Sequence, residues 1–183
     1  MKRKYQEEPT VDKQDECNYW LMKAEPEKRL VRGVDVSFTI DDLKEAKTSI
    51  WDGVRNHVAK KHLASMKVND MAFLYQSSCK NPGITGIMKI VKEKYPDPSA
   101  INPKHPYYDE KIGKGLKENI WVSVDVEFVS KLEKIIFLKD IKSNNELSNM
   151  VLLKQSRLSV SPVTKQEWRT IMTMIEKTKQ KND

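Results

Sequence analysis

Residues 120–129 show the strictest alternation of apolar and polar side chains in the sequence, and this pattern sets the strongest limit on the fold. The apolar positions are Ile120, Val122, Val124, Val126 and Phe128. A period of two residues is typical of a β-strand with one buried face. Such a strand needs partner strands and a core against that face, so the chain is expected to build a sheet.

Three further segments are predicted strands. Residues 19–24 (YWLMKA) form an abrupt apolar run, rich in aromatic residues, that stops before Pro26, as a buried strand would. Residues 71–76 form a second run, and residues 84–91 follow the turn-forming Asn-Pro-Gly at 81–83. Alternation in the last segment places one set of positions on a single face: Ile84, Gly86, Met88 and Ile90.

Capping signals mark the predicted helices. Residues 39–46 and 56–67 each begin with a good N-cap residue, and in the first an aspartate three positions later completes a capping box. A short helical turn is expected at 137–142. A last helix begins after Thr164, which forms a capping box with Glu167, and it carries an apolar stripe of Trp168, Ile171, Met172 and Ile175.

The order of these elements argues against strict strand-helix-strand alternation. We expect an α+β domain, a small mixed, mostly antiparallel β-barrel or curled sheet with flanking helices. Residues 96–118 hold four of the 8 prolines and are predicted to be a long polar loop. Residues 1–18 lack apolar periodicity and are predicted to be a disordered leader, residues 19–178 the folded domain, and residues 179–183 a flexible tail.

The charge of the chain is strongly basic. Its 183 residues include 33 Lys or Arg and 26 Asp or Glu, a formal net charge of +7. Residues 1–16 are slightly acidic, so the basic excess belongs to the folded part. Two interpretations are open: a lysine-rich surface that keeps the protein soluble, or a surface for an anionic partner such as nucleic acid.

Several classes of protein are disfavoured. No apolar run approaches the roughly 20 residues of a membrane span, and no secretory signal is recognisable, so we expect a soluble, intracellular protein. Cys17 and Cys79 form no CxxC pair, and His57, His62 and His105 have no metal-binding spacing. The common nucleotide, hydrolase and protease motifs are absent, and no metal or cofactor is expected.

Lys23, Glu25 and Pro26 close the first predicted strand. Because Lys23 and Glu25 are two residues apart, their side chains point to the same side of the strand. A local ion pair between them is the favoured interpretation. The alternative is a catalytic couple of lysine and glutamate.

Residues 51–56 (WDGVRN) combine a tryptophan, a glycine that permits close backbone approach, and two planar hydrogen-bonding side chains. A pocket for a planar heterocycle would use such residues, because Trp stacks on a ring while the amide and guanidinium groups bind its edge. The competing interpretation is that Trp51 belongs to the core and Asn56 only caps the following helix.

Two more polar segments are candidates. Tyr75, Gln76 and Ser77 end a predicted strand, where the mouth of a barrel would lie, although Tyr75 could equally be core. Residues 157–162 (RLSVSP) place one of the few arginines among hydroxyl groups, where it could bind a phosphate or pair with a carboxylate.

The segments that carry these residues resemble EVE-domain proteins, and among them the thymocyte nuclear protein family. The matching stretches are YWLMKAEP at 19–26, WDGVRN at 51–56, FLYQS at 73–77, GIMKIVKEKYPD at 86–97 and RLSVSP at 157–162. The resemblance implies a PUA-like fold, recognition of modified bases, chiefly 5-methylcytosine and its oxidised forms in DNA, and a nuclear location. One departure is Ala24, where many relatives have Ser.

The resemblance also implies a base-binding pocket. Its residues would be Lys23, Glu25, Pro26, Trp51, Gly53, Val54, Arg55, Asn56, Tyr75, Gln76, Ser77, Arg157, Leu158 and Ser159. We expect Trp51 to stack on a flipped base, Asn56 and Ser77 to bind its edge, and Arg55 and Arg157 to neutralise flanking phosphates.

The leading hypothesis is therefore a monomeric, non-enzymatic module that binds DNA carrying modified cytosine. Two alternatives remain, a reader of modified RNA and a small amidohydrolase that acts on acylated cytidine through Lys23 and Glu25. Lys2, Arg3 and Lys4 form a weak nuclear import signal. Without import through that signal, the protein would be cytoplasmic.

Overall fold

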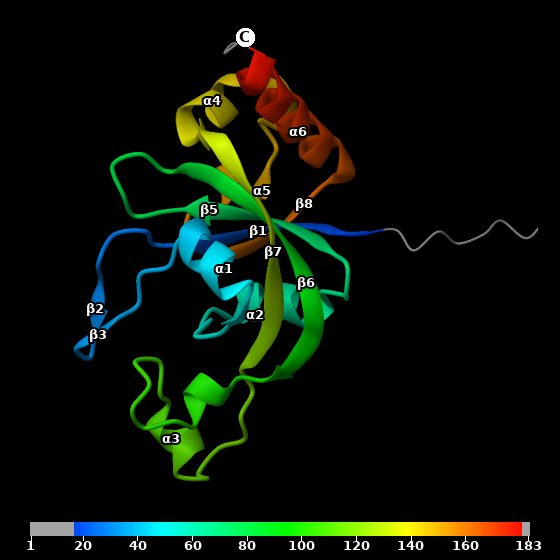
Figure 1. Cartoon of the computed structure of the whole chain (residues 1–183). Coiled ribbons are helices and arrows are strands. Elements are labelled where there is room, and N and C mark those ends of the chain that lie inside the picture. Colours follow the sequence, from blue (N-terminus) through cyan, green and yellow to red (C-terminus); the bar gives the residue numbers. More distant parts are fainter. Residues whose placement is uncertain (1–16, 181–183) are drawn as a thin grey trace, which may run out of the picture.

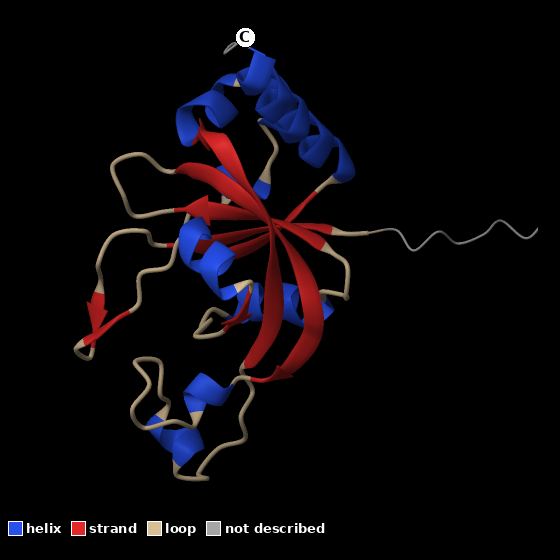
Figure 2. Ribbon diagram, viewed as in Figure 1, coloured by secondary structure: helices blue, strands red, loops and turns tan. Residues whose placement is uncertain are grey.

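The computed structural model of the protein describes residues 17–180. The basic tripeptide at 2–4, nearly all of the predicted leader and residues 181–183 of the predicted tail lie outside this range. Within it the structure forms one six-stranded mixed sheet with flanking helices (Figures 1 and 2). The predicted α+β class is confirmed.

The strands follow the order β4-β7-β6-β5-β1-β8 across the sheet. Their bounds are Tyr19–Ala24 for β1, Thr48–Trp51 for β4, Met71–Gln76 for β5, Gly83–Pro96 for β6, Val122–Phe137 for β7 and Val160–Val163 for β8. Only β1 and β5 are parallel, and the other neighbours are antiparallel. In the described range no ladder joins the edge strands β4 and β8, so the sheet is open; of the two predicted forms, a barrel or a curled sheet, a closed barrel is not formed.

The sheet does not need to close on itself because helices bury both of its faces. In β1, Trp20 and Met22 join a core with helices α1 (Ile40–Ala46) and α2 (His57–Ser65), whereas Leu21 joins a second core. That second core includes α4 (Leu138–Ser143), α5 (Val151–Lys154), the 3-10 turn η2 (Asn145–Leu147) and α6 (Lys165–Lys179). Burial on both faces explains the continuous apolar runs of β1 and β5.

β6 contradicts the single apolar face predicted for residues 84–90. Ile84 belongs to the core under α6, whereas Met88 and Ile90 belong to the core under α1 and α2. The register of β6 against β7 shifts between Ile84 and Gly86 and again between Ile87 and Met88. The first irregularity changes which face the following side chains point to, so Ile87 lies in the same core as Ile84 and Met88 in the other, and a strict period of two cannot reveal that.

The predicted caps are confirmed. Thr39 and Asp42 form the capping box of α1, and Thr164 and Glu167 form that of α6. Asn56 accepts hydrogen bonds from two backbone amides at the start of α2. These side chains satisfy amide groups that a helix leaves without partners at its first turn.

Two regions contain elements that were not predicted. The short hairpin β2 (Leu30–Val31) and β3 (Val34–Asp35) follows β1. Residues 96–118 are not simply a polar loop: they contain the 3-10 turn η1 (Pro98–Ala100) and α3 (Glu110–Gly113), and Ala100, Ile112 and Trp121 make a small core of their own. We call residues 97–121 the insertion; Figure 1 shows it protruding beyond the sheet. No described helix is long and apolar enough to cross a membrane.

Candidate functional site

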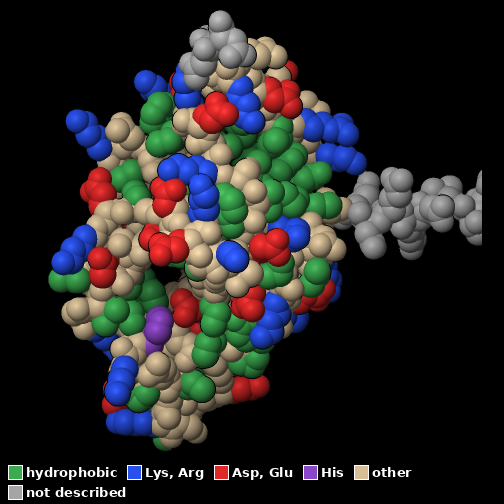
Figure 3. All heavy atoms as spheres, viewed as in Figure 1, with side chains coloured by type: hydrophobic (Ala, Val, Ile, Leu, Met, Phe, Trp, Pro, Cys, Tyr) green, Lys and Arg blue, Asp and Glu red, His purple; other side chains and the backbone are tan. Residues whose placement is uncertain are grey.

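A large cavity lies where several strands end on one side of the sheet. Parallel pairing sets Ala24 at the end of β1 opposite Gln76 at the end of β5. β8 runs antiparallel to β1, so the loop before it reaches the same place, and the Lys23 amide donates to the Ser159 carbonyl (2.8 Å). The hairpin and the insertion form further walls. The cavity measures about 1440 Å³, and Figure 3 shows a hollow on this side.

Most of the predicted site residues line this cavity. They are Lys23, Glu25, Trp51, Gly53, Val54, Arg55, Asn56, Tyr75, Ser77, Arg157 and Ser159. Pro26, Gln76 and Leu158 do not: the Gln76 amide donates to the Asn81 carbonyl (2.6 Å), and Leu158 is buried in the core under α1 and α2. Four separate segments of the sequence are therefore brought together as predicted, with these three positions excepted.

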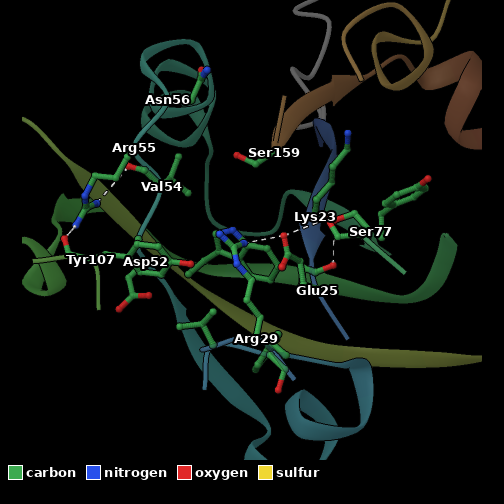
Figure 4. Close-up of a pocket in the computed structure, with 18 of the residues that line it drawn as sticks. Lys23, Glu25, Arg29, Asp52, Val54, Arg55, Asn56, Ser77, Tyr107 and Ser159 are labelled. Atoms are coloured by element: carbon green, nitrogen blue, oxygen red, sulfur yellow. Dashed lines mark hydrogen bonds and ion pairs between the residues drawn. The ribbon is translucent and has the colours of Figure 1, made fainter. Parts of the chain in front are cut away.

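The predicted ion pair between Lys23 and Glu25 is not formed. The Glu25 carboxylate pairs with the Arg29 guanidinium (2.8 Å) and accepts a hydrogen bond from Ser78 (3.1 Å). The Lys23 ammonium instead donates to the Ser156 carbonyl (2.7 Å). Burial lowers the pKa of Lys23. Figure 4 shows Arg29 reaching toward Glu25 across the cavity while Lys23 extends away from it.

Two aromatic rings form the apolar wall. Trp51 is 8% exposed and belongs to the core. It also lines the cavity beside Phe38, and the two rings meet edge to face with centroids 6.0 Å apart. Trp51 is therefore a core residue that also lines the cavity. Phe38 lies outside the segments that sequence patterns had marked, because it stands alone between the hairpin and α1.

Arg55 supports the wall of the cavity instead of offering a free cation. Its guanidinium pairs with the buried Asp97 carboxylate (2.6 Å), and it donates to the Ser99 hydroxyl (3.0 Å) and the Tyr107 carbonyl (2.6 Å). Burial alone would raise the pKa of Asp97, but hydrogen bonds from Ser99 and Arg55 hold it below the usual value. Arg55 therefore has a structural role, and its phosphate contact stays a prediction.

Gly53 permits the close approach of the insertion. Its φ of +71° lies in the left-handed region, and a Cβ at this position would collide with the Tyr107 ring. The Gly53 amide also donates to Asp97 (3.1 Å). Only glycine combines this backbone conformation with this contact. The predicted role of Gly53, close backbone approach, is thus directed at Tyr107.

Asn56 and Asp52 complete this side. The Asn56 side-chain oxygen accepts from the Val58 and Ala59 amides (2.9 and 3.0 Å), so it caps α2 as one of the two interpretations predicted, and the binding of a base edge by Asn56 stays a prediction. Asp52 was not among the predicted site residues. Burial raises the pKa of its carboxyl group, and it lies 3.4 Å from the His105 imidazole of the insertion.

The rim of the cavity is basic. Six Lys or Arg and three Asp or Glu side chains line the cavity. Arg157 is exposed, and within residues 17–180 its side chain makes no ion pair, unlike those of Arg29 and Arg55. Lys104 and Lys142 lie on the same lining and were missed, because single lysines carry no pattern in a sequence with this composition. No cluster of metal-ligating side chains occurs in the range that the structure describes.

Comparisons with known proteins agree with this architecture. The EVE domain family matches residues 18–174. Thymocyte nuclear protein 1 of Homo sapiens is 44% identical over 170 residues, which cover 87% of this chain and 75% of that protein.

Solved structures agree as well. The crystal structure of human THYN1 protein in complex with 5-methylcytosine containing DNA is 44% identical and superposes with a TM-score of 0.81, covering 87% of this chain and 98% of that chain. A Pseudomonas syringae protein is 40% identical with a TM-score of 0.76, covering 86% of this chain and 99% of that one. The matched residues span the sheet, the cavity and the helices on both faces, and the chain belongs to the EVE domain family.

Proposed function

We propose that this protein binds DNA and holds a modified cytosine, 5-methylcytosine or an oxidised derivative, flipped out of the duplex into the cavity. The observation that carries the proposal is one cavity with an aromatic wall, hydroxyl groups and a basic rim. The DNA complex of the 44% identical human protein supports the choice of partner.

The cavity offers the groups that a flipped base needs. The rings of Trp51 and Phe38 provide flat apolar surface for stacking, which is worth about 1 to 3 kcal/mol per base. The hydroxyls of Ser77 and Ser159 lie on the same lining: the Ser77 hydroxyl donates to the Ala24 carbonyl (3.3 Å) and can accept from the edge of a base, and the Ser159 hydroxyl can donate to it or accept from it. The Asn56 oxygen caps α2 and the Arg55 guanidinium pairs with Asp97. These hydroxyls and the Asp52 carboxyl are therefore the proposed polar contacts of the base.

Phosphate binding falls to the rim. Arg157 is exposed, and Lys104 and Lys142 are further basic side chains of the lining without an ion pair among the described residues; Lys23 also lacks an ion pair, but its ammonium donates to the Ser156 carbonyl. These charges suit the phosphates beside an extruded nucleotide because basic side chains release condensed counterions on binding. A few phosphate contacts are expected rather than an extended track.

We further propose that the protein is a reader without catalytic activity. The partners of Lys23 and Glu25 are Ser156 and Arg29, so the two side chains do not act as a couple. Purified protein should release no carboxylate from acylated cytidine. Turnover that is lost in both Lys23→Ala and Glu25→Gln would instead establish the hydrolase alternative.

The nucleus is the proposed place of action. The human relative is named a nuclear protein, and the predicted import signal is the basic tripeptide at 2–4.

The binding test compares duplexes that differ only in one central cytosine, which is unmodified, methylated or oxidised, together with matched RNA. Burying one methyl group contributes about 0.8 kcal/mol. This corresponds to about a fourfold lower Kd for 5-methylcytosine DNA than for unmodified DNA. Equal affinity for all duplexes would contradict the proposal, and preference for the RNA would favour the alternative reader.

Arg157→Ala tests the rim. We expect weaker binding to every duplex by a similar factor and a salt dependence reduced by about one phosphate contact. Arg169→Ala is the matched control, because Arg169 is also exposed but lies on α6 and lines a different groove. If both variants keep the wild-type salt dependence, Arg157 does not contact phosphate.

A further inference from the structure

The hairpin β2–β3 carries unusual apolar exposure for so short an element. Leu30 is 60% exposed and Val34 is 43% exposed. Arg32 and Gly33 form the tip with φ values of 51° and 80°, both in the left-handed region that two-residue hairpin turns require. A leucine held this far into solvent contributes nothing to the core of the domain.

The base of the hairpin is firmly attached. The Asp35 carboxylate accepts from the Arg29 and Ser37 amides (3.2 and 3.0 Å), and the Val36 amide donates to the Arg29 carbonyl (2.9 Å). The Arg29 guanidinium pairs with Glu25, on the cavity wall. The tip is thus presented on a braced support, and few groups would need to be ordered when it binds.

The hairpin also borders the cavity. Val34 and Asp35 line the cavity together with Arg29, whereas Leu30 is not part of the lining. Figure 1 shows the hairpin projecting from the domain on the same side as the insertion, and Figure 3 shows the hollow between protruding parts of this side. Leu30 is therefore beside the proposed base pocket and outside it.

The charges around this leucine match a nucleic acid. Lys28 precedes Leu30 and Arg32 follows it; both are exposed and make no ion pair among the described residues, whereas Arg29 between them is paired with Glu25. An apolar side chain flanked by cations can enter the base stack while the cations meet the phosphates on either side. A protein surface as partner would not require this local basic charge.

We propose that the hairpin β2–β3 is a wedge that enters the DNA duplex, with Leu30 filling the space that the flipped base leaves. This inference rests on the proposed function and deepens it. Extrusion of a paired base costs unstacking and unpairing energy, which is least for a mismatched or single-stranded base. Leu30 offsets that cost by replacing the lost stacking contact, so its effect depends on whether the target base is paired.

The experiment uses the full chain and the variants Leu30→Ser and Leu30→Phe. Three DNA probes carry one 5-methylcytosine: a paired duplex, the same duplex with that base mispaired, and the single strand. A 2-aminopurine beside the modified base reports unstacking by fluorescence. Val68→Ser is the control, because Val68 is 46% exposed and lies before β5, at the end of that strand away from the cavity.

Leu30→Ser should raise the Kd for the paired duplex about tenfold, the scale of burying one apolar side chain. The mispaired duplex and the single strand should be affected less than twofold, and the 2-aminopurine signal on the paired duplex should fall. Leu30→Phe should restore both. An equal loss on all three probes, or a Kd for the paired duplex like that of Val68→Ser, would overturn the wedge. Wild-type protein that binds methylated and unmethylated duplexes alike would remove the proposed function, and the wedge with it.

Discussion

At the scale of single residues, Gly53 decides how closely the insertion approaches the sheet. Gly115 has the same φ of +71° but nothing within 4 Å of its ideal Cβ position, whereas at Gly53 the Tyr107 ring occupies that position. The two glycines therefore share a backbone requirement and differ in one contact. The comparison separates the cost of the conformation from the cost of the collision.

Gly53→Ala is expected to destabilise the protein more than Gly115→Ala. Both substitutions place a residue with a Cβ in the left-handed region, which costs about 1 to 2 kcal/mol. Only Gly53→Ala must also displace the Tyr107 ring. In a Tyr107→Ala background the extra cost should disappear. Chemical denaturation of Gly53→Ala, Gly115→Ala, Tyr107→Ala and the double variant of Gly53 and Tyr107 measures these changes in the free energy of unfolding. Equal costs for the two alanines in the wild-type background would show that the Tyr107 contact has no energetic weight.

Residue patterns predicted the place of the site better than the role of each side chain. The capping role of Asn56 could be predicted, since Asn is a preferred N-cap before a helical segment. The partner of Arg55 could not, because Asp97 lies 42 positions away and only the fold brings it near. One signal in the sequence did point to Asp97, because this residue is the last of the stretch at 86–97 that resembles the family.

At the scale of elements, Asp97 ties the end of β6 to the end of β4 and to η1. One carboxylate oxygen accepts from the Arg55 guanidinium and the Gly53 amide, and the other accepts from the Ser99 amide and hydroxyl. The pKa of Asp97 lies below its usual value. Its contribution to stability is therefore present above the ordinary Asp pKa of about 4 and is lost as pH falls through the lower folded-state value.

Asp97→Asn should lower the free energy of unfolding at neutral pH by about 2 to 3 kcal/mol, because charge-assisted hydrogen bonds are replaced by neutral ones and Arg55 loses its counterion. The difference from wild type should shrink as the pH is lowered from about 5 to about 3. Asp109→Asn is the control: Asp109 caps α3 in the same insertion, and Asn is an equally good cap. A difference for Asp97→Asn that stays constant with pH would contradict the assignment.

Elements with long, regular patterns were predictable and short ones were not. The strand at 71–76 and both capping boxes were found at their observed positions. β4 has four residues and β2 and β3 have two each, which is too short for a period to be recognised. Ile120 was assigned to the buried face of a strand, yet it is 45% exposed and precedes β7.

At the scale of the whole molecule, one sheet separates two cores, and each of them contributes side chains to the cavity lining, Trp51 from one and Tyr75 from the other. Trp51 belongs to the core under α1 and α2. Trp168 belongs to the other core, where its ring stacks between Tyr19 and Phe73 with centroid distances of 4.5 and 4.0 Å. Because Trp51 lines the cavity and Trp168 does not, loss of either ring should lower stability, and only loss of Trp51 should weaken binding.

Trp168→Ala should cost about 3 to 5 kcal/mol of stability. It should leave the affinity for modified DNA unchanged at temperatures where the variant is folded.

Trp51→Ala should also destabilise the protein, because Trp51 is buried. It should in addition weaken binding about tenfold to a hundredfold through the lost stacking surface. Melting curves of the two tryptophan variants, and DNA affinities measured below the melting temperature of the less stable variant, test both predictions. A folded Trp51→Ala variant with wild-type affinity would exclude Trp51 from the base-binding surface.

The position of β1 in the sheet has a consequence for the synthesis of the protein. β1 comes first among the strands, yet it lies between β5 and β8, and its second neighbour starts only at Val160. On the ribosome the earliest strand must remain half paired until nearly all of the chain has emerged. Contacts between such distant segments slow folding and leave unpaired strand edges exposed to aggregation. The arrangement makes completion of this sheet a late event, governed by the last strand to be translated.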